Sequence, residues 1–434
     1  MSGLDLQRST RGCWHHGIPD IVHGLSTDSR HFKPRQVFLA LRGPHFDGHA
    51  FAPRVADRAS ALIGDSKGIP GWSDLSLPQL EVPDTLVALG DIAAAWRRKL
   101  THTTVIAITG SYGKTSVRSM LEHVLQDAGL SVSATHDNRN NLVGVPLTLL
   151  DTPASADIAL IECGISEQGE MDRLAAITRP DAVVLTGLAA AHGEGLGGFS
   201  GVAREKHGLL ASLPDDGWCA LGAGVARQLR EHALPLPTAC MDMDATGHIV
   251  RWRLDGTMLK LRYDNSEASV SLALPAHHWA TNMALTATVI LRLAGVLHRE
   301  NDITLAFIAE SLGRWRPVHG RMQMLTGPNG SMVLDDSYNA NPASMQAAIN
   351  TLAAMDGRHI ALLGDMGELG EEAARLHAGL DVSAVDMLLL AGPMMRYLAD
   401  KTTQTMWLPD TEALAQHVAT MIKEGVFKAG DHIL

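Results

Sequence analysis

The chain has 434 residues, of which 46% are hydrophobic and 19% are charged, as in folded globular proteins and unlike disordered or fibrous ones. This length favours two or three domains over a single core. The net charge of −11 argues against a broad electrostatic surface for nucleic acid or for an anionic membrane.

Neither export nor membrane insertion is predicted by the sequence. No apolar run approaches the roughly 18 residues of a membrane span, and the segment MSGLDLQRSTRGCWHH lacks the apolar core of a signal peptide. The four cysteines are scattered without a CxxC pair, which predicts free thiols in a reducing compartment and no metal knuckle. We therefore expect a cytoplasmic protein that neither binds nucleic acid nor inserts into a membrane.

The first hundred residues have the pattern of a small unit with strands and helices. Short β-like runs occur at 36–41 and 60–64, and the segment 49–59 between them predicts a short helix. A stronger apolar period at 83–100 predicts a longer helix, whose basic last turn suits the carboxyl end of the helix dipole. This helix is expected to lead into a second domain.

Strands and helices alternate from residue 104 onward. The runs 104–110, 156–164 and 180–188 are apolar on both faces, as in buried parallel strands, and a helical stretch follows each of them. This pattern predicts a doubly wound α/β sheet. The segment 249–263 differs, because two alternating runs flank an Asp-Gly pair and predict a hairpin; a long helix is expected at 279–297.

A third alternation begins near residue 315. Strands are expected at 331–336, 359–364, 386–392 and 405–408, and helices at 342–355, 371–380 and 411–424. The sequence GDHIL then has the character of a strand.

The stretch TGSYGKTS follows the first buried strand of the middle region and opens a helix. Gly110 and Gly113 permit a tight turn whose backbone N–H groups face a phosphate. Lys114 adds a positive charge, and Thr115 offers a hydroxyl to Mg²⁺. The usual phosphate-loop pattern has a glycine where Ile108 stands, so a purely structural turn is the alternative. The strand–turn–helix context favours phosphate binding.

Three polar residues fall where predicted parallel strands end, which is where α/β sheets build their sites. Thr115 is one, and Glu162 ends an apolar strand, where a carboxylate is costly unless it is paired or bound to metal. His192 follows the next strand in a glycine-rich loop. Each alone also suits a satisfied hydrogen-bonding residue, but together they favour a metal–phosphate site. Periodicity alone makes Lys206 a solvated helix residue.

Several stretches together resemble the Mur ligase family. They are TGSYGKTS, DNRNNLVGVPLTLL, ECGISEQGEM, AAHGEGLGGFSGVAREKHGLL, DDSYNANPASMQAAINTLA and LLGDMGELG, and the likeness extends from about residue 25 to the end. NNLVGVPLTLL and DDSYNANP are similar to the members that add D-alanyl-D-alanine to UDP-N-acetylmuramoyl-tripeptide, and differ from members for earlier amino acids and from folylpolyglutamate synthetases. The implied fold is α/β in three domains: a small UDP-substrate domain (1–100), a central P-loop doubly wound ATPase domain (101–314) and a carboxy-terminal Rossmann-like domain (315–434).

The resemblance implies ATP and Mg²⁺ as cofactors. The phosphate loop would hold the ATP phosphates, a His278/Asn282 pair would place its asparagine near the adenine, and the third domain would approach the nucleotide. The implied cofactor-binding residues are Gly110, Ser111, Gly113, Lys114, Thr115, Ser116, Asn282, Arg321 and Asp336. The implied metal ligands are Thr115, Glu162, His192 and Lys206, and the implied catalytic residues are Lys114, His192 and Lys206.

Lys206 matches the lysine that is carbamylated in the family. A carbamate turns the cation into a carboxylate-like group, whereas a free ammonium would repel the metal.

The likeness also implies two substrate sites. UDP would bind near the segment 26–51, although a turn-rich domain without a ligand is the alternative there. Asn339 and Asn341 would orient the incoming dipeptide, although Asn-rich turns are common. The implied substrate-binding residues are Thr27, Ser29, Arg30, Asp47, Gly48, His49, Asn140, Asn141, Asn339 and Asn341.

The implied reaction belongs to peptidoglycan precursor synthesis, in a protein expected to be a monomer. The tripeptide carboxylate takes the γ-phosphoryl group of ATP, and the amine of D-alanyl-D-alanine then displaces phosphate, with closure of the domains assembling the site. Two departures from the family pattern leave open the alternative of a divergent ligase that joins another carboxylate and amine. Ile165, Ser166 and Glu167 stand where small or Asn/His residues are usual, and relatives continue beyond GDHIL. An inactive nucleotide-binding module is the other alternative, against which the intact residues Lys114, Glu162, His192 and Lys206 argue.

Overall fold

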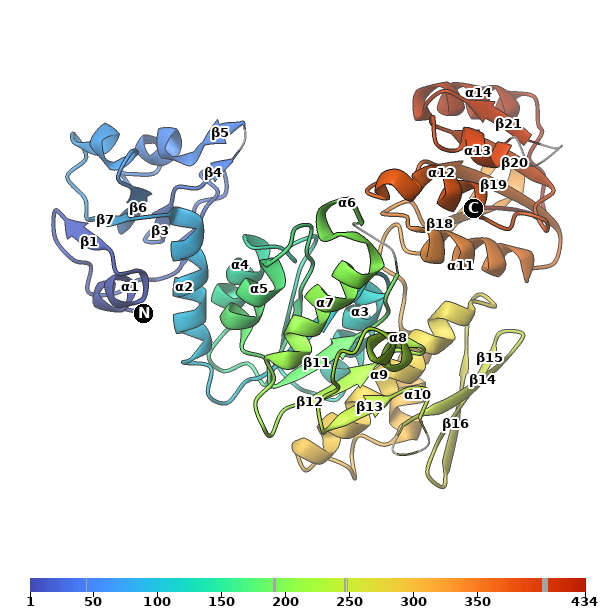
Figure 1. Ribbon diagram of the computed structural model, residues 1–434, viewed down its shortest axis with the longest axis horizontal. Helices are drawn as coiled ribbons and strands as arrows, with labels where there is room; N and C mark the ends of the chain where they lie inside the picture. Colours follow the sequence, from blue (N-terminus) through green and yellow to red (C-terminus); the bar gives the residue numbers. More distant parts are fainter. Residues whose placement is uncertain (44, 190–192, 246, 248, 400–404) are drawn as a thin grey trace.

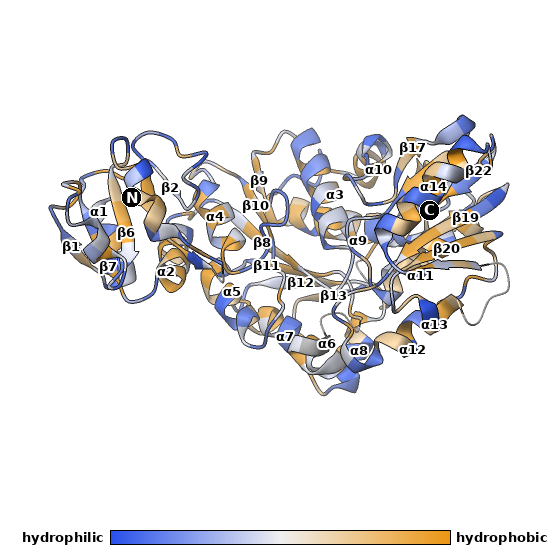
Figure 2. Ribbon diagram, turned by 90° about the horizontal axis from the view of Figure 1, so that it is seen from above, coloured by the Kyte–Doolittle hydropathy of each residue, from blue (hydrophilic) through white to orange (hydrophobic). Residues whose placement is uncertain are grey.

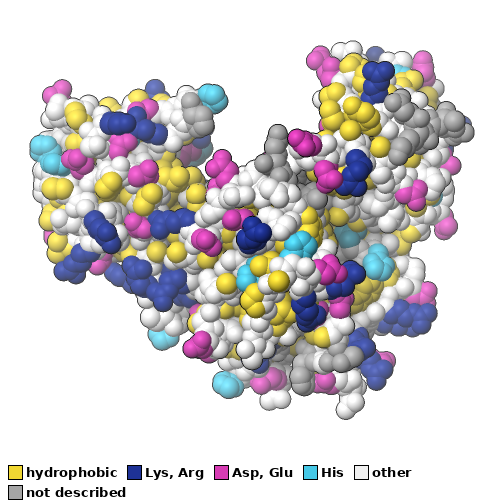
Figure 3. All heavy atoms as spheres, in the orientation of Figure 1, with side chains coloured by type: hydrophobic (Ala, Val, Ile, Leu, Met, Phe, Trp, Pro, Cys, Tyr) yellow, Lys and Arg dark blue, Asp and Glu magenta, His cyan; other side chains and the backbone are white. Residues whose placement is uncertain are grey.

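The computed structural model describes residues 1–43, 45–189, 193–245, 247, 249–399 and 405–434 (Figure 1). Three lobes, each built on its own main sheet, follow one another along the longest axis (Figure 1). The amino-terminal lobe and the carboxy-terminal lobe flank an open hollow above the central lobe (Figure 3). The mixed α/β architecture with parallel sheets confirms the predicted fold class.

The amino-terminal lobe has a five-stranded sheet that is parallel except at β1. In sheet order the strands are β1 (Cys13–His15), β7 (Gln79–Val82), β6 (Ala61–Asp65), β3 (Val37–Leu39) and β2 (Leu25–Ser26). The lobe also has α1 (Gly3–Thr10), the short pair β4 (Arg42–Gly43) and β5 (Phe46–Asp47), η1 (Gly48–Arg54) and η2 (Ile69–Trp72). The helix predicted at 49–59 is the 3₁₀ helix η1, which contains Pro53, a residue without an N–H for an α-helical bond.

Helix α2 (Thr85–Arg97) joins the amino-terminal lobe to the central lobe. Asp84 caps it by accepting a hydrogen bond from the backbone N–H of Val87. Its first turns pack Ala88, Leu89 and Ile92 into the amino-terminal core, and its end reaches the central lobe, where Arg97 pairs with Asp181 at 2.9 Å.

The central lobe is built on a six-stranded sheet in which every strand is parallel. In sheet order the strands are β13 (Cys240–Asp242), β12 (Trp218–Leu221), β11 (Ala182–Leu185), β8 (Thr104–Thr109), β10 (Ile158–Glu162) and β9 (Val132–Ala134). The chain moves from β8 toward β9, and later from β11 toward β13 on the other side. The topological switch point therefore lies between β8 and β11, where α/β sheets bind ligands beyond the carboxyl ends of the strands.

Helices cover both faces of the central sheet. The helices are α3 (Lys114–Asp127), α4 (Gly144–Asp151), α5 (Glu170–Thr178), α6 (Gly193–Leu196), α7 (Gly198–Ala211), α8 (Val225–Glu231), α9 (His277–Val296) and α10 (Leu305–Arg314). Alternate residues of β8 point to opposite faces: Ile106 and Ile108 pack with α3, α9 and α10, whereas Val105 and Ala107 pack with α4, α5 and α7. Figure 2 shows the resulting apolar interior of the sheet beneath hydrophilic outer helix faces.

Helix α9 bears on the membrane prediction. It is 20 residues long and, by length and composition, is the one described helix that is long and apolar enough to cross a membrane. However, 67% of its apolar window is buried inside the protein, where it packs against α3 and α10, as expected for a core helix.

The predicted hairpin is present in a three-stranded antiparallel sheet. It pairs β14 (Arg251–Asp255) with β15 (Met258–Tyr263), with Asp255 opposite Met258 and Gly256 at a φ of 57° in the turn. The third strand, β16 (Ser266–Ser271), was not predicted, because in its sequence SEASVS only Val270 is a buried hydrophobic residue.

The carboxy-terminal lobe has six strands, parallel except for β17. In sheet order they are β17 (Gln323–Thr326), β18 (Met332–Asp335), β22 (Asp431–Ile433), β19 (Arg358–Gly364), β20 (Met387–Ala391) and β21 (Thr405–Leu408). The helices are η3 (Pro328–Gly330), α11 (Pro342–Ala353), η4 (Gly370–Glu372), α12 (Ala373–Ala378), α13 (Arg396–Ala399) and α14 (Thr411–Lys423). The segment GDHIL forms the predicted strand, β22, between β18 and β19.

Candidate functional site

The glycine-rich turn after β8 has the predicted strand–turn–helix geometry. Gly110 has a φ of 150°, and a Cβ there would lie 2.1 Å from Thr186 Oγ1; Gly113 has a φ of 82° and precedes the first residue of α3. The backbone N–H of Ser111 donates to the carbonyl of Gly187 at 2.8 Å, which ties the turn to the end of β11. The turn therefore lies at the switch point, with the amino end of a 14-residue helix directed at any bound anion.

A cavity of about 870 Å³ lies over this turn, between the central lobe and the carboxy-terminal lobe. The predicted residues that line it are Ser111, Gly113, Lys114, Thr115, Ser116, His278, Asn282, Arg321, Asp336, Asn339 and Asn341. The structure thus brings together residues of three distant segments: the turn, the first two turns of α9, and the region from Arg321 to α11.

Lys206 is buried and Lys114 is half-buried, and both lie beside this turn. The Nζ of Lys114 donates to the carbonyl of Gly110 at 2.7 Å, and burial lowers the pKa of Lys114, against the opposing charge of Glu162. Burial, with a further contribution from the charge of Lys114, lowers the pKa of Lys206 to about 7. Two ammonium groups in one buried site repel, so an anion or the loss of a proton is favoured here.

The interpretation of Lys206 as a solvated helix residue was wrong, because its side chain is only 1% exposed. Residues Val202, Leu209 and Leu210 lie four before, three after and four after it, and all are buried on the same face of α7. The apolar spacing around Lys206 was therefore the signal in the sequence that could have identified it.

Glu162 is 1% exposed and fully hydrogen-bonded. One carboxylate oxygen, Oε1, accepts from Nε of Arg118 at 2.8 Å, and the other, Oε2, accepts from the hydroxyl of Thr115 at 3.2 Å. The sequence did not single out Arg118. The predicted His192 lies outside the described residues.

The carboxy-terminal lobe contributes a charged pair to the cavity. The guanidinium of Arg321 lies 4.2 Å from the ring centroid of Tyr338, and Oδ1 of Asp336 accepts from the backbone N–H of Met322 at 3.0 Å. Burial raises the pKa of Asp336 to about 7, and the nearby charge of Arg321 opposes this rise. Tyr338 lies within the stretch DDSYNANP, but the sequence analysis did not single it out as a site residue.

On α9, the imidazole of His278 is the polar group that stands out. Its Nδ1 is buried and has no hydrogen-bond partner among the described residues, and burial, with the charge of His277, lowers its pKa to about 4. One turn later, Asn282 lies close to the phosphate-loop turn, since a Cβ on Gly113 would be 3.3 Å from its Oδ1. A neutral imidazole and a carboxamide suit a neutral ligand group better than a phosphate.

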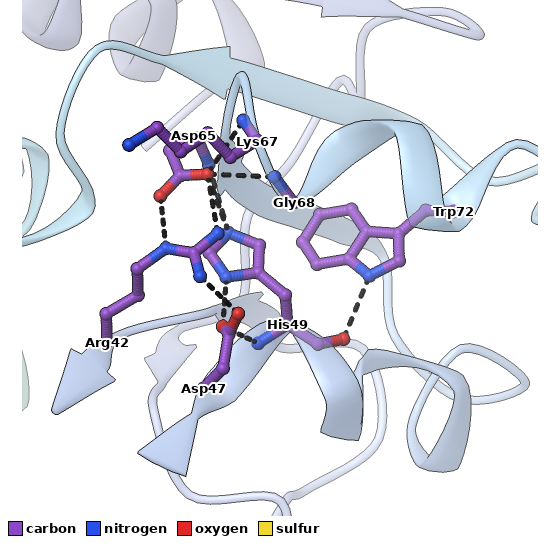
Figure 4. A network of polar contacts seen from close by, with 7 residues as sticks. All are labelled: Arg42, Asp47, His49, Asp65, Lys67, Gly68 and Trp72. Atoms are coloured by element: carbon purple, nitrogen blue, oxygen red, sulfur yellow. Dashed lines mark hydrogen bonds and ion pairs between the residues drawn. The ribbon is translucent and has the colours of Figure 1, made fainter. Parts of the chain in front are cut away.

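The predicted UDP-binding residues lie apart from this cavity. Thr27 and Ser29 are partly exposed, and the exposed Arg30 pairs with Asp28 at 2.9 Å. Asp47 and His49 are held in the network of Figure 4, and the backbone N–H of Gly48 between them donates to the carbonyl of Leu41 at 2.7 Å. Within the described parts of the chain, none of these six predicted residues lines the 870 Å³ cavity.

The network in Figure 4 occupies both ring nitrogens of His49. Nδ1 lies 2.6 Å from Oδ1 of Asp47, and Nε2 accepts from the backbone N–H of Asp65 at 3.1 Å. Trp72 stacks on the imidazole at 5.2 Å between ring centroids, and Arg42 joins the carboxylates of Asp47 and Asp65. His49 is 5% exposed, so its first role is to hold this lobe together.

The predicted residues Asn140 and Asn141 lie at the start of α4. The side chain of Asn141 accepts from the backbone N–H groups of Val143 and Gly144, which satisfies free donors at the helix start. The carbonyl of Asn140 accepts from Gly164 at 2.7 Å, two residues beyond Glu162. Asn140 therefore lies at the same edge of the sheet as the phosphate-loop turn.

A larger cavity, of about 1210 Å³, lies at the opposite edge of the central sheet, where Thr104 begins β8 and Asp181 immediately precedes β11. Arg97 lines it, but its guanidinium already bonds to Asp181 and to the carbonyls of Thr178 and Arg179. Parallel sheets bind ligands beyond their carboxyl ends, and the phosphate-loop turn lies there. The smaller cavity is therefore the candidate functional site.

Comparison with known proteins agrees with this geometry in all three lobes. Residues 21–97 match the Mur ligase family, catalytic domain; residues 108–290 match the Mur ligase middle domain; and residues 320–434 match the Mur ligase, glutamate ligase domain.

Individual relatives match over most of their length. The UDP-N-acetylmuramoyl-tripeptide–D-alanyl-D-alanine ligase of Escherichia coli (strain K12) is 34% identical over 94% of this chain and 90% of its own. The ligase of the same name from Bacillus subtilis (strain 168) is 28% identical over 88% and 82%. A crystal structure of MurF from Acinetobacter baumannii superposes with a TM-score of 0.85 at 26% identity, covering 100% of this chain and 94% of that one. The chain therefore belongs to the Mur ligase family.

Proposed function

We propose that this protein is an ATP-dependent ligase that adds D-alanyl-D-alanine to UDP-N-acetylmuramoyl-tripeptide during peptidoglycan precursor synthesis. The observation that carries the proposal is the cavity in which a glycine-rich turn at a helix amino terminus meets Lys114, Arg321 and Asp336. The E. coli relative, 34% identical over 94% of this chain, bears the name of this activity.

ATP is proposed to bind with its phosphates on the turn from Gly110 to Ser116. Lys114, now bonded to Gly110, would exchange that carbonyl for a phosphate oxygen, because a half-buried ammonium gains more from an anion than from a neutral carbonyl. Asn282 and His278 would face the adenine, and Arg321 and Asp336 would reach the nucleotide from the other lobe. The choice of an adenine nucleotide is supported by the structure of a MurF ligase from Thermotoga maritima, with the same fold at a TM-score of 0.78, which was solved in complex with ADP.

The donor atoms present suit Mg²⁺. The hydroxyl of Thr115 and Oε2 of Glu162 lie 3.2 Å apart, and Mg²⁺ prefers such hard oxygen donors. His192 and a carbamate on Lys206 are the other proposed ligands, although no group of three His, Cys, Asp or Glu side chains gathers among the described residues. When bound, Mg²⁺ would neutralise negative charge on the transferring phosphoryl group.

Lys206 is proposed to act as a carbamate. Its lowered pKa, about 7, leaves a substantial fraction of neutral amine near neutral pH. The amine nitrogen can then bond to the carbon of CO₂ and lose a proton, which replaces a second buried cation beside Lys114 with an anion.

The reaction proposed has two steps. The tripeptide carboxylate attacks the γ-phosphorus of ATP, giving an acyl phosphate and ADP. The neutral amine of D-alanyl-D-alanine then attacks the acyl carbon, phosphate leaves with the C–O bonding electrons, and the amine loses a proton. Lys114 stabilises the charge that accumulates as two anions approach in the first step.

The substrates are proposed to approach from two sides of the cavity. Thr27, Ser29 and Arg30, with Asp47, Gly48 and His49 near them, would receive UDP in the amino-terminal lobe, and Asn140 and Asn141 would contact the substrate between that lobe and the phosphate-loop turn. Asn339 and Asn341 would face the dipeptide. We further propose domain boundaries at 1–100, 101–314 and 315–434, and a monomer that acts in the cytoplasm.

The direct test measures phosphate release with UDP-N-acetylmuramoyl-tripeptide, ATP and Mg²⁺, with and without D-alanyl-D-alanine. Release that needs both substrates, with a product heavier by the dipeptide in mass spectrometry, is expected. Release with a different amine or acceptor would instead identify a divergent ligase. ATP binding without turnover on any pair would indicate a nucleotide-binding module.

A further inference from the structure

Arg118 links the helix that begins at the phosphate-loop turn to the strand-end carboxylate. Arg118 lies one turn after Thr115 on α3 and is 7% exposed. Its Nε lies 2.8 Å from Oε1 of Glu162, and its Nη1 lies 2.5 Å from Oε2 of Glu122. One guanidinium thus serves two carboxylates, of which Glu162 is 1% exposed and Glu122 is 22% exposed.

The contact between Arg118 and Glu162 determines which carboxylate oxygen of Glu162 is available to a bound cation. Because Arg118 occupies Oε1, only Oε2 faces the hydroxyl of Thr115. The strand end itself is fixed as well, since the backbone N–H of Glu162 donates to the hydroxyl of Thr135 at 2.9 Å. Rotation of the carboxylate would break a buried ion pair, which is strongly unfavourable.

We propose that Arg118 is a positioning residue that restricts Glu162 to a single oxygen ligand and so favours Mg²⁺ over larger cations. This inference rests on the proposed binding of ATP with Mg²⁺. Mg²⁺ requires near-ideal octahedral geometry and takes one oxygen from a carboxylate, whereas Ca²⁺ readily takes both oxygens in a larger shell. With Oε1 held by Arg118, Glu162 offers the arrangement that suits the smaller ion.

The guanidinium also sets the charge of the site. Glu162 and Glu122 carry two negative charges, and Arg118 reduces their sum to one. Without Arg118, Glu162 would be a buried carboxylate with one unpaired oxygen, which attracts any divalent cation more strongly and can bind it through both oxygens.

The test compares nucleotide binding to the full chain in the presence of Mg²⁺ or Ca²⁺, by isothermal titration calorimetry with ADP. In Arg118→Met we expect the ratio of the Mg²⁺-supported to the Ca²⁺-supported affinity to fall by about tenfold, since removing a residue that hydrogen-bonds to a metal ligand typically changes metal affinity by about 10–100-fold. Arg118→Lys keeps the charge but lacks the planar guanidinium that bonds Glu162 through Nε and Glu122 through Nη1, so it is expected to give an intermediate ratio.

Glu122→Gln is the matched control. It removes the other carboxylate and leaves the bond between Arg118 and Glu162, so its ratio is expected to equal that of the wild type.

An ion pair that only stabilises the fold would give a different result. Arg118→Met would then lower the thermal midpoint but leave the ratio unchanged, which would overturn the inference. If Arg118→Met does not fold, an unchanged ratio in Arg118→Lys overturns it equally. Failure of the wild type to bind ADP with either cation would instead count against the proposed function.

Discussion

The side-chain nitrogen of Asn341 lies 3.3 Å from the carbonyl oxygen of Ser111 and donates a hydrogen bond to it across the interface of two lobes. Asn341 also caps α11, because its Oδ1 accepts from the backbone N–H of Ser344 at 3.0 Å. The residue is 8% exposed. One side chain therefore connects the start of a carboxy-terminal helix directly to the phosphate-loop turn.

Replacing Asn341 separates these two contacts. Asn341→Ala loses both, and we expect a loss of about 1 kcal/mol in the free energy of unfolding from the cap, together with a several-fold rise in the KM for ATP. Asn341→Ser keeps a capping oxygen but is too short to reach Ser111, so it should raise the KM with little change in stability. Chemical denaturation and steady-state kinetics give the two readouts. An unchanged KM in both variants would show that the contact with Ser111 does not affect nucleotide binding.

Lys206→Met tests the buried amine. The variant keeps an apolar stem of similar length and removes a buried amine, so its thermal midpoint should equal or exceed that of the wild type. Turnover should fall by at least about 100-fold, the order seen when one electrostatic group is removed from an active site. With ¹³C-bicarbonate, a carbamate signal should appear by NMR in the wild type and be absent in this variant. Retained turnover would remove Lys206 from the proposed mechanism.

Asp336 should make stability depend on pH. Burial raises its pKa to about 7, Asp335 adds to this rise, and Arg321 opposes it. The folded state therefore binds this proton more tightly than the unfolded chain, in which an aspartate titrates near pH ~4. The contribution of Asp336 to the free energy of unfolding is fully present below about pH 4 and is lost as the pH rises through about 7. Its upper bound is about 4 kcal/mol.

Asp336→Asn should flatten this pH dependence, because it removes the titrating carboxyl group. The variant should keep the local structure, since its side-chain oxygen can still accept a hydrogen bond from the backbone N–H of Met322. Denaturation of both proteins between pH 5 and pH 8 measures the difference. Parallel pH profiles for the two proteins would contradict the prediction.

His49→Ala distinguishes a structural role from a substrate contact. It removes the stacking partner of Trp72 and the acceptor of the backbone N–H of Asp65, so the free energy of unfolding should fall by about 3 kcal/mol. At temperatures where the variant is folded, a KM for the UDP substrate equal to that of the wild type would restrict His49 to this structural role and remove it from the proposed UDP site. If His49 contacts the substrate, the KM rises in His49→Ala and also in the better-tolerated His49→Gln.

Local sequence patterns predicted much of the fold and of the cavity. The buried strands, the Asp-Gly hairpin and the glycine-rich turn depend on short-range periodicity and backbone freedom, which the sequence shows directly. Arg118 and Tyr338 could not be predicted, because their roles come from partners at Glu162 and Arg321, which only the tertiary structure brings near. Lys206 is an intermediate case, since the apolar residues around it on α7 already placed it on an inward face.

The position of β22 has a consequence for how the carboxy-terminal lobe folds. This strand pairs His432 with Met332 of β18 on one side and with His359 of β19 on the other. The two halves of that sheet can join only after a segment far away in the chain has inserted between them, and such non-local pairing makes folding slow. Until then β18 and β19 have unpaired edges, so the unfinished lobe is open to misassembly and to binding by a chaperone.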